Sequence, residues 1–391
     1  MNNKQNTDLV FRQKKVQVAI EQAGVSACLI ASNVNLYYLS GTIFDGYIYI
    51  PAQGDLLYFV RRGSLDAVPE SQIFSIRKPE DIPSVLEGMG LSLPKDLLLE
   101  ADQLTYNECM RLKAAFNLLS FDNATPLLRK LRSVKSAWEI GQFRISAAKH
   151  AQAYSTIKGA YHSGISDLEF QANIEREMRL LGSIGAFRGF GSSMEIFMGS
   201  ILVGDNASTP SPFDFALGGG GIHPSVPVGA NGSILSAGKS VMVDMVGNYT
   251  AYLSDMTRVF SVGKLPDIAY RAHQVSIDIQ EAIALQCRPG ASCAELYELS
   301  VAMVKEAKLS EYFMGTKQQA KFIGHGVGIE INELPIFSPR SRDLIEQGNV
   351  FALEPKFVLP GIGAVGTENT YLMGEKGLEK LTIFDESITI F

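Results

Sequence analysis

The chain has 391 residues, of which 46% are hydrophobic and 19% are charged, and its formal net charge at pH 7 is -6. A chain of this length exceeds the usual limit for one hydrophobic core, so we expect two domains. The charge is modestly negative and no cluster of Lys and Arg is interleaved with aromatic residues, which argues against a nucleic-acid partner.

The first third of the chain alternates between helix and strand patterns. Residues 11–24 have helical periodicity and end at Gly24. Apolar, β-forming runs predict strands, and one further amphipathic segment predicts a helix. The strands are expected at 27–31, 47–50, 56–60 and 97–100, and the helix at 81–89. This alternation predicts a small α/β domain over residues 1–131.

The second domain, residues 132–391, is expected to open with a long helix. Ser136 is followed three residues later by Glu139, which is a capping-box pattern at a helix N-terminus. Two more helices are predicted at 167–181 and 268–286. Helices followed by a hairpin, twice over, favour a pseudo-symmetric α+β domain, although no internal sequence repeat is evident.

Two aspartates lie in a predicted hairpin of this domain. Asp244 belongs to an apolar, strand-like run and Asp255 to a run rich in β-formers, with the turn signal Gly247-Asn248 between them. The midpoint between the aspartates falls at residues 249 and 250, which would make them cross-strand neighbours. Directly opposed residues have Cβ atoms roughly 5 Å apart. Both carboxylates would then reach one cation.

A second predicted hairpin repeats this construction. Glu354 and Glu368 lie in strand-like runs whose midpoint is Gly361, in a Pro-Gly-Ile-Gly turn. His325 stands between glycines in Gly-His-Gly-Val-Gly, where a ligand can approach the backbone closely. Each hairpin would present two acids, and the histidine would add one imidazole.

Four converging carboxylates repel one another unless cations lie between them. A ligand set of oxygens with one nitrogen suits Mn²⁺, Fe²⁺, Co²⁺ or Zn²⁺ better than a thiolate-preferring metal. The alternative is that these acids are separate surface charges and that the histidine belongs to the core. Acids in apolar strands are seldom buried without a partner, and their mirrored contexts favour a metal site.

At these positions the chain resembles the pita-bread metallopeptidases, which comprise aminopeptidase P, prolidase, methionine aminopeptidase and the metal-free relative creatinase. The resemblance rests on five residues together with their contexts, and the two-domain layout fits the creatinase and prolidase branch. The five are Asp244, Asp255 in Ser-Asp-Met-Thr-Arg, His325, Glu354 in Glu-Pro, and Glu368. The resemblance implies an α/β N-terminal domain followed by an α+β pita-bread catalytic domain.

The resemblance also implies roles for these residues. Two divalent ions (Mn, Co, Zn or Fe) would be bridged by Asp255 and Glu368, with Asp244 completing one ion and His325 and Glu354 the other. Two such ions activate a bridging water and polarise a carbonyl oxygen. Glu354 would be the general base. Thr257, two residues after Asp255, would orient a ligand carboxylate.

The residues expected around the substrate depart from the family pattern. Asn332 and Lys321 stand where Xaa-Pro peptidases usually carry histidines, and Gly366 stands where an arginine is common. His223, in a glycine-rich loop before Pro224, is close to the position of a further family histidine. We therefore predict that His223 takes part in catalysis and binds substrate together with Lys321 and Asn332.

The sequence thus favours a dinuclear metal hydrolase, an Xaa-Pro dipeptidase or aminopeptidase. A non-peptidase enzyme on the same site, a lyase or an amidinohydrolase, is the first alternative, and a binding protein that kept only the fold is the second. The expected partners are a small peptide or small-molecule substrate and, by resemblance, a second copy of the chain.

The N-terminus is polar, with no apolar segment of a secretion signal, and no apolar run is long enough to span a membrane. The four cysteines show no disulfide or metal spacing. We therefore expect a cytoplasmic protein with reduced thiols and no membrane partner.

Overall fold

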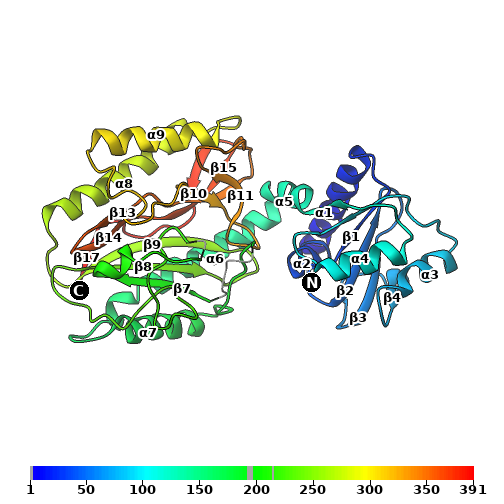
Figure 1. The fold of residues 1–391 in the computed structure, drawn as a ribbon, viewed down its shortest axis with the longest axis horizontal. Helices are drawn as coiled ribbons and strands as arrows, with labels where there is room; N and C mark the ends of the chain where they lie inside the picture. The colour runs from blue at the N-terminus through cyan, green and yellow to red at the C-terminus, as the bar shows by residue number, and fades with distance from the viewer. Residues whose placement is uncertain (1–2, 192–196, 214) are drawn as a thin grey trace. The chain divides into compact units, whose positions relative to one another are not determined.

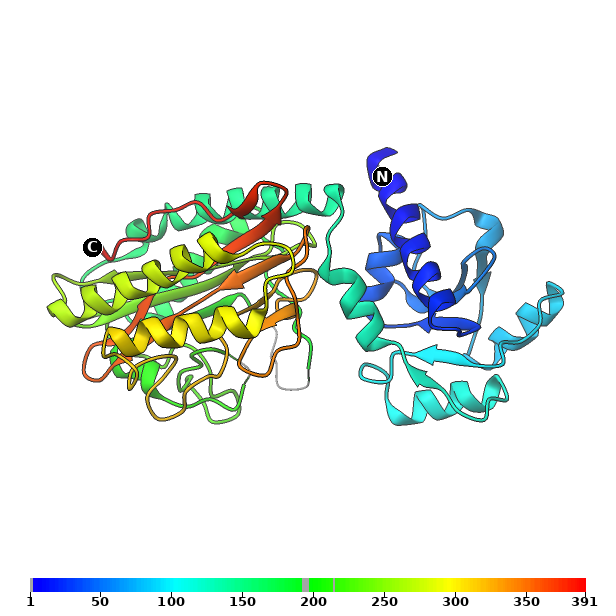
Figure 2. The same ribbon diagram turned by 90° about the horizontal axis from the view of Figure 1, so that it is seen from above.

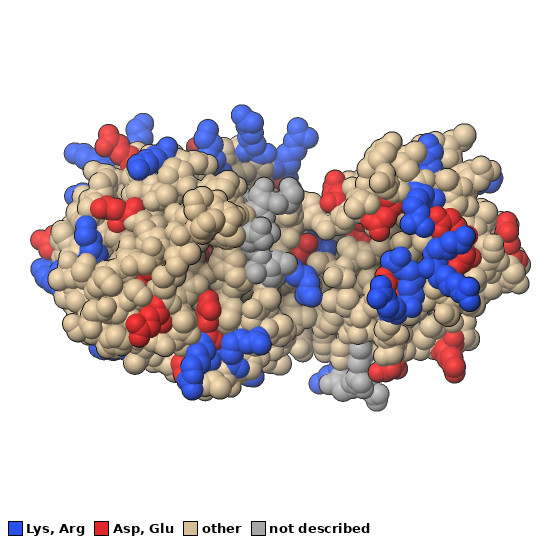
Figure 3. Space-filling model, turned by 60° about the horizontal axis from the view of Figure 1, so that its bottom comes forward, with Lys and Arg blue, Asp and Glu red and all other residues tan. Residues whose placement is uncertain are grey.

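The computed structural model describes residues 3–191, 197–213 and 215–391. The chain forms two compact units, Met1–Arg132 and Ser133–Phe391. Figures 1 and 2 show the helices and strands of each unit from two directions. Among the described helices, none combines the length and apolar character that a membrane crossing requires. On the face drawn in Figure 3, Lys and Arg lie among Asp and Glu on both units, so neither sign covers that face alone.

The N-terminal unit is built on a six-stranded sheet with the order β4-β3-β2-β1-β5-β6. The central strand β1 pairs antiparallel with β2 and parallel with β5, and every residue of β1 and β5 is buried. Its strands are β1 (Ala27–Ile30), β2 (Asp45–Pro51), β3 (Leu57–Arg62), β4 (Ile73–Ser75), β5 (Leu97–Leu99) and β6 (Asp122–Asn123). Its helices are α1 (Asn3–Gln22), α2 (Asn33–Ser40), η1 (Glu70–Gln72), α3 (Asp81–Gly88), α4 (Tyr106–Ala115) and α5 (Thr125–Ser133).

The strands and the helix at 81–89 predicted for this unit are confirmed within a residue or two at each end. Helix α1 begins at Asn3, earlier than the predicted residue 11, and Gly24 follows its end with a φ of 70°. Helix α2, which was not predicted, has Ser32 as N-cap and Gly41 as C-cap. Its run of Tyr and Leu reads as a strand, and only the two caps mark it as a helix.

The second unit contains a four-stranded sheet (β17-β9-β8-β7), a five-stranded sheet (β11-β10-β12-β15-β16) and a separate two-stranded pair, β13 with β14. The strands are β7 (Gly199–Val203), β8 (Ser240–Gly247), β9 (Ser254–Ser261), β10 (Gly324–Gly326), β11 (Glu333–Phe337), β12 (Val350–Leu353), β13 (Lys356–Leu359), β14 (Gly363–Gly366), β15 (Asn369–Gly374), β16 (Gly377–Lys380) and β17 (Thr389–Ile390). The helices are α6 (Ala137–Tyr154), η2 (Ile157–Ala160), α7 (Asp167–Leu180), η3 (Gly204–Ser208), α8 (Asp267–Gln286) and α9 (Cys293–Glu306).

The helices of this unit cover the strands from two sides (Figure 1). Helices α6 and α7 pack against β7, β8 and β9, and α8 packs against β13 and β14. Each helix pair closes its own hydrophobic core, one around Ile201 and Val243 and the other around Ile279 and Phe351. The strands that carry the predicted ligands therefore lie between two apolar layers.

The predicted helix starts are confirmed where a cap marks them. Ser136 Oγ accepts the backbone N–H of Glu139, and the Glu139 carboxylate accepts the backbone N–H of Ser136. Ser166 caps α7, whereas α8 begins at Asp267 after Pro266 without a side-chain cap. Each cap satisfies backbone donors that the first helical turn leaves unpaired.

Candidate metal centre

The hairpin of β8 and β9 carries both aspartates on one face, but they are not directly opposed. The register pairs Asp244 with Thr257 and Val246 with Asp255. The predicted register, in which the aspartates face each other across the hairpin, is therefore wrong by two residues. An even shift preserves the face of every side chain, so the two carboxylates are diagonal neighbours.

The second hairpin has the predicted register. Leu353 pairs with Asn369 in the β12–β15 ladder, and Lys356 pairs with Gly366 in the β13–β14 ladder, so both ladders are centred on Gly361. The turn glycine has a φ of 77°. Glu354 and Glu368 lie at the break between these two ladders, where the chain leaves one sheet for the other.

At this break the backbone of each glutamate bonds to a different strand. The N–H of Glu354 donates to the carbonyl of Ile323 at 2.8 Å, and the N–H of Glu368 donates to the carbonyl of Thr257 at 3.3 Å. The first bond ties Glu354 to the strand that carries His325, and the second ties Glu368 to the strand that carries Asp255. The break in the ladder therefore aims both glutamates at the other ligands.

His325 lies on β10, which pairs with β12 and β11. A Cβ on Gly324 or on Gly326 would lie 2.3 Å or 2.0 Å from a neighbouring carbonyl oxygen, so the flanking glycines allow the strands to approach. His325 Nδ1 donates to the carbonyl of Gly326 at 3.1 Å, so Nε2 is the ring nitrogen directed at the acids. Nε2 lies 3.4 Å from Glu354 Oε1 and 3.9 Å from Asp255 Oδ2.

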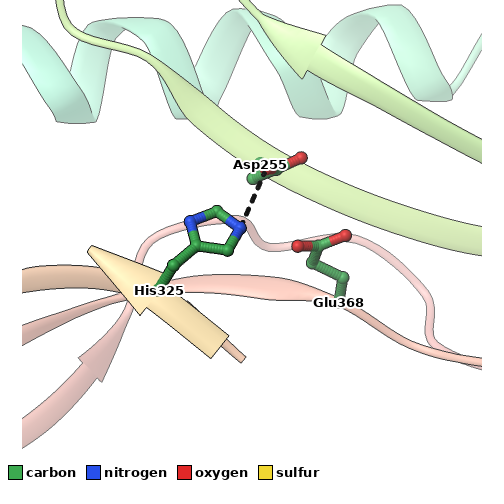
Figure 4. A group of neighbouring side chains, drawn as sticks. All are labelled: Asp255, His325 and Glu368. Atoms are coloured by element: carbon green, nitrogen blue, oxygen red, sulfur yellow. Dashed lines mark ion pairs between the residues drawn. The ribbon is translucent and has the colours of Figure 1, made fainter. Parts of the chain in front are cut away.

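Asp255, His325 and Glu368 form a compact set of donors, shown in Figure 4. One ligand atom of each residue lies within 4.8 Å of the others. The three side chains come from β9, from β10 and from the junction of β14 with β15, and they converge on one point (Figure 4). Two carboxylate oxygens and one imidazole nitrogen suit Mn²⁺, Fe²⁺, Co²⁺ or Zn²⁺. The residues present therefore fit one divalent ion at this point.

The charges of these groups affect one another because the groups are buried and lie close together. Burial and the charge of Asp244 raise the pKa of Asp255 to about 7. Burial disfavours the charged form of His325, but the hydrogen bond and charge of Glu354, together with Asp255, outweigh it and raise the pKa of the imidazole to about 9. Both shifts follow from several acids that lie close together in a buried site.

A positive side chain that the sequence analysis did not identify lies inside this site. The side chain of Lys356, on β13, is 0% exposed. Its Nζ donates to Glu354 Oε2 at 2.7 Å, to Asp244 Oδ2 at 2.9 Å and to Glu368 Oε2 at 3.0 Å. Burial opposes the charge of Lys356, but these three carboxylates raise its pKa well above the usual value.

The lysine also acts on its neighbours. Burial by itself would raise the pKa of Glu354, but the charge of Lys356 and the hydrogen bond from His325 hold it at about 2. For Glu368, burial and the charges of Asp255 and Glu354 prevail, and its pKa lies well above its usual value. The ammonium thus compensates part, but not all, of the negative charge of the four acids.

Two buried side chains hold the ligand strands in place. Thr257 Oγ1 donates to Glu368 Oε2 at 2.7 Å. Arg258 donates to the carbonyl of Glu368 at 2.9 Å and to Asn369 Oδ1 at 2.8 Å. Because Thr257 and Arg258 are consecutive on β9, this strand fixes both the carboxylate and the backbone of Glu368.

The side chains predicted to contact substrate lie in three different settings. His223 is exposed, and its Nδ1 lies 2.8 Å from Ser225 Oγ in the same loop. Asn332 bonds to the backbone of Phe190 through both halves of its amide, at 2.8 Å and 2.6 Å. Lys321 is exposed beside a cavity. Among the described residues, neither His223 nor Lys321 hydrogen-bonds to the five predicted ligands.

The cavity beside Lys321 has a volume of ≈280 Å³ and lies in the second unit. Its wall includes Leu217, Gly218, Thr316 and Phe322. The ring of Phe322 lies 6.4 Å from the ring of His325, so this wall adjoins the ligand set.

Gly366 lies opposite Lys356, and the site has no room for a side chain there. A Cβ on Gly366 would lie 2.7 Å from the carbonyl oxygen of Pro355 and 3.0 Å from the Cα of Lys356. Its φ is 131°, a value that L-residues rarely adopt. A side chain at position 366 would therefore clash with this backbone, and the positive charge beside the acids is that of Lys356 on the opposite strand.

One signal in the sequence points to Lys356. It is a lysine inside the apolar run from Val350 to Leu359, two residues after Glu354. Residues two apart in a strand share a face, so the lysine belongs on the side of the acids. Only the pairing of the hairpin with its neighbours shows that Asp244 and Glu368 are its partners.

Comparison with known proteins covers both units. Residues 141–375 match metallopeptidase family M24, and residues 12–134 match the creatinase/prolidase N-terminal domain. The Xaa-Pro dipeptidase of Pyrococcus horikoshii is 26% identical over 374 residues, which cover 94% of this chain and 96% of that protein. The uncharacterized peptidase YqhT of Bacillus subtilis is 26% identical over 381 residues, covering 95% and 98%.

Solved structures of similar proteins share this architecture over their full length. The prolidase from Pyrococcus horikoshii OT3 has a TM-score of 0.76 at 24% identity, covering 96% of this chain and 98% of that one. The Xaa-Pro dipeptidase from Bacillus anthracis has a TM-score of 0.82 at 23% identity, covering 98% and 100%. At these identities the likeness concerns the fold.

Proposed function

Because the chain belongs to metallopeptidase family M24 and is a metallohydrolase, we propose that it is a metal-dependent peptidase acting on Xaa-Pro substrates, as a dipeptidase or an aminopeptidase. The predicted family and the predicted fold, an α/β N-terminal domain with an α+β pita-bread catalytic domain, are confirmed. The proposal depends most on the convergence of Asp255, His325 and Glu368 within 4.8 Å. Relatives named Xaa-Pro dipeptidase support the substrate class.

We propose that Asp255, His325 and Glu368 hold a divalent ion, with Glu354 beside them. Such an ion lowers the pKa of a coordinated water and polarises a carbonyl oxygen. Glu354 Oε1 faces His325 at 3.4 Å and is the proposed acceptor of the proton. The sequence also predicts a second ion completed by Asp244. Lys356 donates to one oxygen of Asp244 and to one oxygen of Glu368, both of which are predicted ligands of this second ion.

The part of the substrate remote from the reacting bond is proposed to bind in the cavity lined by Lys321 and Phe322. Its volume, ≈280 Å³, is near the lower end of small-ligand sites. Lys321 lines this cavity, and we propose that it contacts the substrate there. The predicted roles of His223 and Asn332 in catalysis and binding stay predictions, and the exposed position of His223 makes His223→Ala a direct test.

The test compares cleavage of an Xaa-Pro dipeptide, an Xaa-Pro-Xaa tripeptide and matched Ala-Ala peptides by protein loaded with Mn²⁺, Co²⁺, Zn²⁺ or Fe²⁺. We expect cleavage that requires proline after the scissile bond, and the preferred length separates dipeptidase from aminopeptidase. His325→Ala should abolish metal binding and cleavage. His162→Ala is the matched control, because His162 is an exposed histidine of the same unit paired with Glu169.

A second candidate is a non-peptidase enzyme on the same site. Two observations favour it: Lys356 lies among the acids, and Asn332 is bonded to the backbone of Phe190 rather than directed to a substrate. Metal-loaded protein that cleaves none of these peptides would contradict the peptidase and favour this candidate. The homodimer and the cytoplasmic location stay predictions, which sedimentation equilibrium and cell fractionation test.

A further inference from the structure

We infer that Lys356 takes the place of one of the two cations, so that the centre binds a single divalent ion. The ammonium would neutralise the side of the centre formed by Asp244, and the ion would lie with Asp255, His325 and Glu368. The inference rests on the proposed metal site and specifies how many ions it holds.

Lys356 uses all the hydrogen-bond donors of its ammonium group within this site. An ammonium group has three donors and no acceptor. Lys356 directs them to one oxygen each of Glu354, Asp244 and Glu368, at 2.7, 2.9 and 3.0 Å. These are the lengths of charge-assisted hydrogen bonds. No donor of the ammonium remains for a substrate, so Lys356 is a positioning residue.

The glutamates present different oxygens to the ammonium and to the proposed ion. Glu354 Oε2 accepts from Lys356, whereas its Oε1 lies 3.4 Å from His325 Nε2. Glu368 Oε2 accepts from both Lys356 and Thr257, and its Oε1 has no hydrogen-bond partner among the described residues. One ion and one ammonium can therefore share these carboxylates without competing for the same atoms.

A second ion would compete with the ammonium. It would need Asp244 as its own ligand, and Asp244 Oδ2 is 2.9 Å from Lys356 Nζ. An ion bound to that oxygen would lie next to a like charge in a buried site, where repulsion is poorly screened.

Lys356 is held where it is by its backbone. Its carbonyl accepts the N–H of Met314 at 2.8 Å, and it pairs with Gly366 across the hairpin. The side chain is 0% exposed and the strand β13 is buried throughout. A second ion could displace the ammonium only into this apolar packing, and burying an unpaired charge there is unfavourable.

The test is the number of ions that the full-length protein binds. Metal-stripped protein is dialysed against increasing Mn²⁺, and bound ion is measured by elemental analysis and by electron paramagnetic resonance. We expect one ion per chain with the spectrum of an isolated Mn²⁺. Two ions per chain in the wild-type protein would overturn the inference and leave the proposed function standing. No bound ion would overturn both.

Lys356→Ala removes the ammonium and should raise the number of bound ions from one to two. Two ions about 3.5 to 4 Å apart share ligands, so the spectrum should become that of a coupled pair. Lys264→Ala, at an exposed lysine of the same unit, should still bind one ion. A single ion in folded Lys356→Ala would contradict the inference.

Asp244→Asn keeps the test decisive if Lys356→Ala fails to fold. If Asp244 holds the lysine and not the ion, this variant should still bind one ion. Its affinity should fall by no more than the roughly 10- to 100-fold typical of an outer-shell partner. Loss of all ion binding in Asp244→Asn would show that Asp244 is itself a ligand, and the single-ion arrangement would be wrong.

Discussion

Replacing Lys356 with Met should destabilise the metal-free protein more than any exposed substitution. Met preserves most of the length and volume of the side chain but removes the charge. Three carboxylates would lose charge-assisted hydrogen bonds of 2.7 to 3.0 Å in a site where the lysine is 0% exposed. Removing one partner of a buried ion pair typically costs about 3 to 5 kcal/mol, which is the expected loss in the free energy of unfolding.

The assay is urea unfolding in EDTA, followed by the fluorescence of Trp138. This is the only tryptophan of the chain, and it packs edge-on against Tyr252 in the catalytic unit, so it reports on that unit. Lys264→Met should change the unfolding free energy by less than about 0.5 kcal/mol, as exposed substitutions usually do. Both variants are compared with the wild-type protein at pH 8 and at pH 5.

The loss of unfolding free energy in Lys356→Met should be larger at pH 8 than at pH 5. Without the ammonium, the pKa values of Glu354 and Glu368 rise, so the acids can take up protons at low pH and relieve their repulsion. A loss below about 1 kcal/mol at pH 8, or one that does not depend on pH, would refute the reasoning. In that case the charge of Lys356 does not stabilise the three acids that it contacts.

Two further predictions concern single residues. Burial and the charge of Asp244 raise the pKa of Asp255 to about 7, whereas an unfolded aspartate titrates near about 4. The folded, metal-free protein therefore binds this proton more tightly, and its stability should fall as pH rises from about 4 to 7. Urea unfolding should show that the difference in unfolding free energy between the wild type and Asp255→Asn changes over this pH range. A difference that stays constant with pH would contradict the raised pKa. Asn332→His removes both amide bonds to Phe190, so it should cost about 1 to 3 kcal/mol of stability without accelerating Xaa-Pro cleavage. A tenfold gain in kcat/KM would instead show that residue 332 faces the substrate.

Features that depend on interactions within a few residues could be predicted from the amino-acid sequence. The capping box of Ser136 and Glu139 fixes the start of α6 because its bonds lie within one turn. The register of the second hairpin follows from its turn at Gly361, because only three residues separate β13 from β14. A short turn leaves one way to pair the strands, so the opposition of Glu354 and Glu368 could be read from the chain.

The register of the first hairpin, between β8 and β9, depends on tertiary contacts. Six residues, 248–253, separate the paired ends of β8 and β9. This loop is shaped by α6: Ser146 Oγ accepts the N–H of Thr250 at 3.1 Å and lies 3.0 Å from Thr250 Oγ1. A contact with a residue more than a hundred positions away cannot be found from turn propensity, so the predicted register was two residues off.

Tertiary structure also decided what the four acids surround. The sequence identifies acids that need positive charge, because desolvated carboxylates repel one another, and the natural inference is two metal ions. Lys356 is visible in the sequence as a lysine in an apolar strand. Its partners come from β8, from the break after β12 and from the break after β14, which are brought together only when two sheets and a hairpin pack. Whether a charge is supplied by the chain or by an ion is a property of that packing.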